Sequence, residues 1–479
     1  MTILTIAWLI LPFIVGLGIY LLPRLDWVLA FGVTLVSFAY ATFVFRQPEP
    51  IALELLDSFG VTLMADRQSA FFILTNAFVC TAVLLYCWRS NKTPFFYTQL
   101  TILQGSVNSV FICADFLSVY VALEVISIAA FLLITYSRSD RVIWVGLRYL
   151  FVSNVAMLFY LVGTVLVYKA NNSFAFGGLT NAPTEAIALI FLGLLAKGGI
   201  FISGLWLPLT HSESETPVSA LLSGVVVKTG VFPLVRCALM LEDIDPIVRF
   251  FGVGTALLGV SYAVFEQDIK RMLALSTISQ LGFILAAPEV GGFYALTHGL
   301  VKSTLFLIGG NLPSRNLKEL QHNPMPNSLW IALTLASFSI SGFPLLSGFG
   351  AKVLTMKNLL PWQTIAMNIA ALGTASMYGK LIFLPHERLE EGGKKKSIGF
   401  WLAIAILIGG LMGVSAFYYQ AYTLANIVKP LATIALGWLV YLLILRQTTV
   451  RLPRMLEQFD HLMGMMSLML LLLFWMVLP

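Results

Sequence analysis

The stretch that decides the fold is FLGLLAKGGIFISGLWLPLTHSESETPVSALLSGVVVKTGVF, residues 191–232. It is almost wholly apolar, yet it carries Lys197 inside its first apolar run and Lys228 inside its last. A charged side chain at the centre of a bilayer costs about 2.5–3.5 kcal/mol on insertion scales. Lysines at two such positions therefore indicate a function that needs them there.

The whole chain is as apolar as this stretch. Of its 479 residues, 58% are hydrophobic and only 11% are charged, and the mean hydropathy is +0.88. Soluble domains carry about 25% charged residues, and apolar runs of about twenty residues, long enough to cross a bilayer, recur here from end to end. We therefore expect an integral, multi-pass protein with the lipid bilayer as its main partner.

The net charge of +6 does not indicate a nucleic-acid partner, because the basic residues are spread over loops. When the loops are alternated across the membrane, most basic residues fall on one side, which the positive-inside rule assigns to the cytoplasm, with both termini outside. That side includes Arg24, Arg89, Arg138, Arg141, Lys270, Arg271, Arg315 and Arg454.

We predict an all-α polytopic fold with about 14–16 transmembrane helices. The N-terminal apolar run lacks a basic start and continues into further spans, so it is read as a retained helix and not as a signal peptide. The expected spans are residues 2–22, 27–45, 69–88, 95–113, 116–136, 144–168, 185–206, 217–239, 244–266, 271–288, 290–312, 328–359, 363–384, 398–418, 424–446 and 462–478.

Helix-breaking residues interrupt two of these spans. Glycines and a proline flank Lys197 in GLLAKGGIFISGLWLPLT, and the run SISGFPLLSGFGAK leads into Lys352. Broken helices are tolerated in a membrane where protein or a wet cavity satisfies the freed backbone groups, and paired breaks are typical of transport sites between inverted repeats. We therefore predict two inverted repeats of about five helices each. The predicted division is N-terminal helices 1–94, repeats 95–239 and 244–386, and C-terminal helices 398–479.

Six ionisable side chains are expected within or directly beside apolar spans: Glu124, Lys197, Lys228, His298, Lys302 and Lys352. On lipid-facing surfaces they would together cost well over 10 kcal/mol, so we expect them to face the interior. His298 and Lys302 are four residues apart and share one helix face. Burial disfavours a charged lysine and a nearby carboxylate favours it. Movement of Glu124 relative to Lys197 would thus switch a proton, and the series predicts a proton relay.

Individual members also have plainer explanations. Lys352 could snorkel from a helix end, and His298 alone could be a hydrogen-bonded core histidine. Glu124 and Lys197 could form a purely structural ion pair. Lys380, near the end of a span, is read as an interfacial anchor.

Cysteine indicates no metal chemistry. Cys80, Cys87, Cys113 and Cys237 are scattered and form no CxxC motif, so neither zinc nor an iron–sulfur cluster is expected. The chain also lacks the glycine-rich fingerprint of a dinucleotide-binding domain. We expect no metal and no cofactor, and no route for hydride or electrons in this chain.

The run HSESETPVSALLSGVVVKTGV resembles the H-x-E-x-x-TPVSALLSG-x-x-x-K-x-G signature of one antiporter-like family. Mrp-type cation/proton antiporters share that family with the proton-pumping subunits of respiratory and photosynthetic NADH dehydrogenases, and the resemblance spans residues 60–385. Where some members carry a second histidine one turn before His298, this chain has Tyr294. By resemblance, the family's relay positions fall, in chain order, on Glu124, Lys197, Lys228, His298 with Lys302, and Lys352.

Two further stretches, GSVNSVFICADFLSVYVALEV and LALSTISQLGFIL, are more similar to the D subunit of Mrp antiporters than to dehydrogenase subunits. The resemblance implies a proton-translocating subunit of a multisubunit Na+(K+)/H+ antiporter. It also implies other membrane subunits as partners, protons with Na+ or K+ as cargo, and a plasma (inner) or thylakoid membrane.

Two other functions stay open at this point. One is a proton-pumping, chain 4-like subunit of an NAD(P)H–quinone oxidoreductase, whose redox chemistry would lie in other subunits. The other is a structural membrane scaffold with a degenerate channel, which six buried ionisable residues disfavour.

Overall fold

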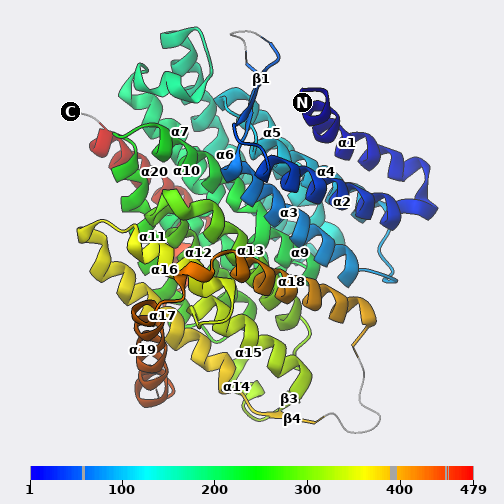
Figure 1. The fold of residues 1–479 in the computed structure, drawn as a ribbon, viewed down its shortest axis with the longest axis vertical. Coiled ribbons are helices and arrows are strands. Elements are labelled where there is room, and N and C mark those ends of the chain that lie inside the picture. Colours follow the sequence, from blue (N-terminus) through cyan, green and yellow to red (C-terminus); the bar gives the residue numbers. More distant parts are fainter. Residues whose placement is uncertain (1, 57–59, 389–395, 448–449, 451, 478–479) are drawn as a thin grey trace.

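The computed structural model describes residues 2–56, 60–388, 396–447, 450 and 452–477, and these form a helical bundle (Figure 1). The antiparallel strands β1 (Ile51–Glu54) and β2 (Thr62–Ala65) lie between the second and third helices. The first helices are α1 (Thr2–Leu21), α2 (Asp26–Phe45), α3 (Arg67–Tyr86), α4 (Pro94–Val110), α5 (Phe116–Ile134) and α6 (Asp140–Asn171).

The central part of the chain alternates long helices with short ones. A parallel pair of short strands, β3 (Met325–Pro326) and β4 (His386–Glu387), joins two of its loops. Its helices are α7 (Thr184–Gly198), α8 (Leu207–Glu213), α9 (Thr216–Leu221), α10 (Lys228–Met240), α11 (Asp245–Phe265), α12 (Ile269–Ala286), α13 (Gly291–Gly309), α14 (Leu317–Leu320), α15 (Asn327–Ser341), α16 (Ser347–Lys357) and α17 (Thr364–Ile382).

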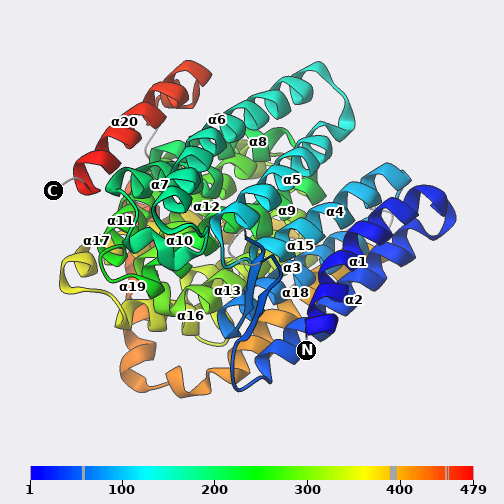
Figure 2. The same ribbon diagram turned by 90° about the horizontal axis from the view of Figure 1, so that it is seen from above.

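The last three long helices pack against different parts of the bundle. α18 (Ile398–Phe417) packs against α3 and α13, α19 (Leu424–Val440) against α17, and α20 (Phe459–Val477) against α7. Figure 2 shows α20 at the edge of the bundle opposite to α1 and α2. The C-terminal part of the chain therefore touches both the middle and one edge of the molecule.

The chain is an integral, multi-pass membrane protein, and the predicted all-α class is confirmed. Every expected span contains helix, but only twelve helical segments of the described residues are long and apolar enough to cross a membrane, fewer than the predicted 14–16. The others are short, broken or more polar: α4, α13, the α15–α16 pair and α17. All of α13 is buried, and a helix surrounded by protein does not need the apolar surface that lipid demands. The division into inverted repeats stays a prediction.

Both predicted helix breaks are present. α7 ends because Gly199 adopts a left-handed φ of +68°, and a 3-10 segment, Phe201–Trp206, then leads to α8. α15 ends in the same way at Gly342, with φ +89°, before α16 begins. A third interruption was not predicted: a π-helical turn, Leu222–Val226, ends two residues before Lys228. Such turns are frequent at functional sites.

Candidate functional site

The two lysines of the opening stretch lie on helices whose backbones touch. A Cβ placed on Gly230 of α10 would lie 2.3 Å from the backbone nitrogen of Gly198 in α7, so only glycine fits there. Lys197 directly precedes one glycine and Lys228 lies two residues before the other. The crossing therefore holds the two lysine-bearing segments together.

Hydroxyl groups hold the ammonium of Lys197, which is only 3% exposed. Its Nζ donates to the Oγ of Ser127 on α5 and to the Oγ of Ser153 on α6, the latter at 2.8 Å. Ser127 also donates to the carbonyl of Leu123 at 2.8 Å, which leaves its oxygen free to accept from the ammonium. The ring of Tyr149 lies 5.7 Å from Nζ. Neutral oxygens and an aromatic face thus surround this charge.

Glu124 is half-buried on α5, three residues before Ser127. Within the described ranges, no ion pair joins its carboxylate to Lys197. Positions three apart lie on one helix face, so Glu124 and Ser127 face the same region. The expected gating pair is thus present in an unpaired arrangement, in which hydroxyls take the hydrogen bonds of the lysine.

Lys228 is wholly buried beside α13. Its Nζ donates to the carbonyls of Gly224, at 2.5 Å, and Ser223, at 3.3 Å, both in the π-helical turn. A Cβ placed on Gly299, the residue after His298, would lie 3.7 Å from this Nζ. The central lysine therefore borders the helix that carries His298 and Lys302.

Lys302 is linked to a chain of hydroxyls. Its Nζ donates to the carbonyl of Leu273, at 2.9 Å, and to the hydroxyl of Tyr378 on α17, at 3.1 Å. That hydroxyl lies 3.0 Å from the Oγ of Ser276. Lys302 is therefore fully buried among neutral oxygens, as Lys197 and Lys228 are.

A small cavity of about 10 Å³, roughly the space of one water molecule, is lined by both His298 and Lys352. Both ring nitrogens of His298 lack a hydrogen-bond partner in the described part of the chain, as does the Oγ of Ser339, which also lines the cavity. Lys352 is 5% exposed and its Nζ donates to the carbonyl of Ser341 at 3.4 Å, so it does not snorkel to a surface. Unpaired polar groups around such a space fit an ordered water.

Tyr294, which stands where other family members are expected to have a histidine, lines the same cavity. Its hydroxyl donates to the Oε1 of Gln280 at 2.6 Å. Lys380 lies apart from these residues, and its Nζ donates to the carbonyls of Val264 and Glu266 at the end of α11. Its side chain is only 7% exposed, and the interpretation of Lys380 as an interfacial anchor stays a prediction.

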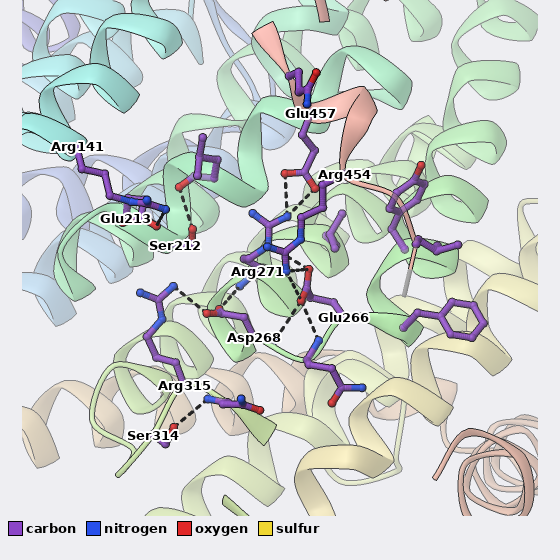
Figure 3. Close-up of a pocket in the computed structure, with 18 of the residues that line it drawn as sticks. Arg141, Ser212, Glu213, Glu266, Asp268, Arg271, Ser314, Arg315, Arg454 and Glu457 are labelled. Carbon is purple, nitrogen blue, oxygen red and sulfur yellow. Dashed lines mark hydrogen bonds and ion pairs between the residues drawn. The ribbon is translucent and has the colours of Figure 1, made fainter. Parts of the chain in front are cut away.

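Sequence reasoning missed the hydroxyl partners and also a charged cluster around a cavity of about 1080 Å³ (Figure 3). At its centre, Arg271 donates to both carboxylate oxygens of Glu457, at 2.6 and 2.8 Å, and to Glu266 at 3.0 Å. Arg454 also pairs with Glu266. Arg271 and Glu457 are so far apart in sequence that no local pattern joins them, whereas Ser127, one turn from Glu124, could have been found.

Comparison with known proteins decides the family. Residues 113–377 match the family described as NADH:quinone oxidoreductase/Mrp antiporter, TM. The chain belongs to this family. The matched residues include all six members of the expected relay, from Glu124 to Lys352.

Within the family, the chain is similar to antiporter D subunits. It is 26% identical over 391 residues to the D subunit of the Na(+)/H(+) antiporter of Alkalihalophilus pseudofirmus, an alignment that covers 73% of this chain and 79% of that protein. It is also 26% identical over 363 residues to the putative antiporter subunit mnhD2 of Staphylococcus aureus, with 68% and 72% covered.

Two solved structures share the fold. A chain of the Mrp complex from Dietzia sp. DQ12-45-1b superposes with a TM-score of 0.76 and 22% identity, covering 93% of this chain and 56% of that one. A chain of the membrane-bound sulfane sulfur reductase, an archaeal respiratory membrane complex, gives a TM-score of 0.75 and 21% identity, with 90% and 99% covered. Chains with the same fold thus occur in an antiporter complex and in a respiratory complex.

Proposed function

We propose that the chain is the D-type subunit of a multisubunit Mrp-type Na+(K+)/H+ antiporter and translocates protons through its buried Glu/Lys/His series. One observation carries this proposal. The four lysines of the series are buried and donate to neutral oxygens, and among the described residues none of them forms an ion pair with a carboxylate. A permanent buried charge without a counter-charge is costly, so such lysines suit a proton that comes and goes.

Protons would pass along the series in chain order, moving laterally within the plane of the membrane. Glu124 and Lys197 form the gate of the first half, with Ser127 and Ser153 holding the lysine when the gate is open. Lys228 carries the proton to α13, where His298 and Lys302 form the link. A water in the cavity beside His298 then connects to Lys352 at the second broken helix.

The exchanged cation and the partners rest on resemblance. The similar D subunits are named as antiporter subunits, one of them for Na+ and H+. We therefore infer Na+ or K+ as the counter-ion of the complex, other membrane subunits as neighbours, and no cofactor in this chain. The inferred location is a plasma (inner) or thylakoid membrane.

A second function, the proton-pumping membrane subunit of an NAD(P)H–quinone oxidoreductase, is favoured by the family match and by the likeness to a respiratory complex. In that setting the same relay would be driven by electron transfer in other subunits. Among the described residues there is no group of three or more His, Cys, Asp or Glu side chains that could hold a metal ion.

Purification from the native membrane in a mild detergent, followed by mass spectrometry of the bound subunits, separates the two functions. The antiporter function predicts only hydrophobic subunits, including a second antiporter-like chain. A hydrophilic arm with iron–sulfur clusters would contradict it and support the redox-driven pump. In either complex, Lys197→Ala is expected to assemble normally and to lose proton translocation.

A further inference from the structure

Arg148 is a buried guanidinium that forms no ion pair among the described residues, although the carboxylate of Glu457 attracts it from a longer distance. It is 8% exposed, lies on α6 and lines the large charged cavity. One of its terminal nitrogens donates to the backbone carbonyl of Glu457, and its Nε has no partner within the described ranges. No carboxylate of the described residues forms an ion pair with it.

The other arginines that line this cavity are all neutralised. Figure 3 shows Arg271 and Arg454 with Glu266 and Glu457, Arg315 with Asp268, and Arg141 with Glu213. The carboxylates of the cavity are thus largely occupied by these pairs. Arg148 is the arginine of this cavity that no carboxylate holds in an ion pair, so its guanidinium is the one with donors left for an added anion.

The depth of Arg148 in the membrane indicates which anion can reach it. α6 has 32 residues, and at about 1.5 Å per residue it is longer than the hydrocarbon core of about 30 Å. Arg148 lies about two turns from the N-terminal end of α6, which places it near the headgroup level. Trp144, 55% exposed, lies one turn earlier with its ring centroid 5.8 Å from the guanidinium carbon. Tryptophan is enriched at this level of a membrane.

The same helix offers a path for an acyl chain. Leu147 and Phe151 are exposed on the turns around Arg148, and the ring of Phe151 contacts Phe459 at the start of α20. An apolar surface thus adjoins the charged cavity. Free phosphate would need only the cavity, whereas a phospholipid would also use this surface.

We propose that this cavity binds a phosphate group through Arg148, with an anionic phospholipid headgroup as its source. The planar guanidinium fork matches the oxygens of a phosphodiester. Trp144 lies against the headgroup, and the acyl chains follow the exposed face of α6. The site is independent of the proton relay, so it stands or falls separately from the proposed function.

The test uses the purified, delipidated protein in detergent. Its thermal unfolding is followed while phosphatidylglycerol, phosphatidylcholine or inorganic phosphate is added. Arg148→Gln is compared with wild type and with Arg24→Gln, which removes an exposed arginine on the same expected side of the membrane. Phosphatidylglycerol should stabilise wild type and Arg24→Gln, while phosphatidylcholine should not. Arg148→Gln should need about tenfold more of the lipid, since a hydrogen bond to a charged group contributes about 1.5–3 kcal/mol.

Each of the other possible results either supports or overturns the proposed site. An equal effect of inorganic phosphate would support the anion site with free phosphate as its source. Equal effects of the two lipids on wild type, or an unchanged response of Arg148→Gln, would overturn the proposal. Should Arg148→Gln not fold, Arg148→Lys serves in its place, because it keeps the charge and loses the fork. An unaltered lipid response in Arg148→Lys would then count against the site.

Discussion

At the scale of single residues, the proposed gate of the relay includes hydroxyl groups as well as charged groups. Lys197 donates to Ser127 and Ser153, whose oxygens are 3.1 Å apart, and Glu124 stands one turn away on the same helix as Ser127. The lysine therefore has neutral acceptors available whenever it is not paired with the carboxylate. This arrangement lets the ammonium leave Glu124 without losing all its hydrogen bonds.

Replacing both serines with alanine should slow proton transport. A hydrogen bond to a charged group contributes about 1.5–3 kcal/mol, so the Ser127→Ala, Ser153→Ala double variant should transport about tenfold more slowly or worse. Dye-monitored proton uptake into membrane vesicles measures the rate. Ser261→Ala is the control, because that exposed hydroxyl bonds only to the carbonyl of Leu257 in its own helix. Unchanged transport in the double variant would remove the serines from the gate.

Tyr378 makes an independent prediction for the second half. Tyr378→Phe keeps the ring and removes the hydroxyl that joins Lys302 to Ser276. We expect severalfold slower proton transport at an unchanged level of assembled protein. A variant that transports as fast as wild type would show that this hydroxyl is not on the path.

The residues that carry charge could be predicted, while their partners could not. A lysine inside an apolar run stands out because of its cost in a membrane, which identified Lys197, Lys228 and Lys302. A serine or tyrosine in a helix is common and carries no such signal. Ser153 and Lys197 are 44 positions apart, so only the packing of α6 on α7 brings them together.

At the scale of elements, the proposed relay would depend on the close crossing of α7 and α10. We expect Gly230→Ala to lower the free energy of unfolding by about 1–3 kcal/mol. The added Cβ would meet the backbone of Gly198, which cannot move aside as a side chain could. The unfolding temperature in detergent measures this. Gly409→Ala in α18 is the control, since nothing lies within 4 Å of its added Cβ. Equal stability of the two variants would contradict the crossing.

The charged cluster also joins elements, and its strength should depend on pH. Burial raises the pKa of Glu266, but Arg271 and the backbone amides of Asp268 and Gln267 more than offset this and hold the pKa below its ordinary value of 4.5. The stability that this carboxylate contributes is therefore present above about pH 4.5 and is lost as the pH falls through the lowered value.

Glu266→Gln should thus lower the free energy of unfolding by about 1–3 kcal/mol at pH 7, and by less as the pH falls below the ordinary value. Thermal unfolding of wild type and variant over a pH series measures the difference. A difference that stays constant as the pH falls from 7 to well below 4.5 would refute the role of this ion pair.

Helix breaks were predictable where glycine or proline caused them. Gly199 and Gly342 take left-handed conformations at the two expected breaks. The π-helical turn before Lys228 contains a glycine and two valines, which are weak helix formers, but such residues also occur in unbroken helices and do not predict a π turn. Gly224 of this turn packs closely against Ser303 of α13, a contact that no local pattern encodes.

At the scale of the whole molecule, the composition predicted the fold class correctly but not the number of helices that are apolar enough to cross the membrane. The apolar runs predicted an all-α membrane protein, but α13 and α17 lie among other helices and carry polar residues such as His298 and Lys380. The hydropathy of these two helices therefore does not indicate whether they lie within the bundle. The return of α20 to α7 depends on contacts between distant parts of the chain, which no local pattern encodes.

The central claim is that protons cross through the buried lysines, and Lys228 tests it most directly. Sodium-driven proton movement should be measured in vesicles that contain equal amounts of the assembled complex with Lys228→Ala or Lys169→Ala, the latter an exposed lysine at the end of α6. The account predicts background transport for Lys228→Ala and wild-type transport for Lys169→Ala. Transport by Lys228→Ala at the wild-type rate would contradict it.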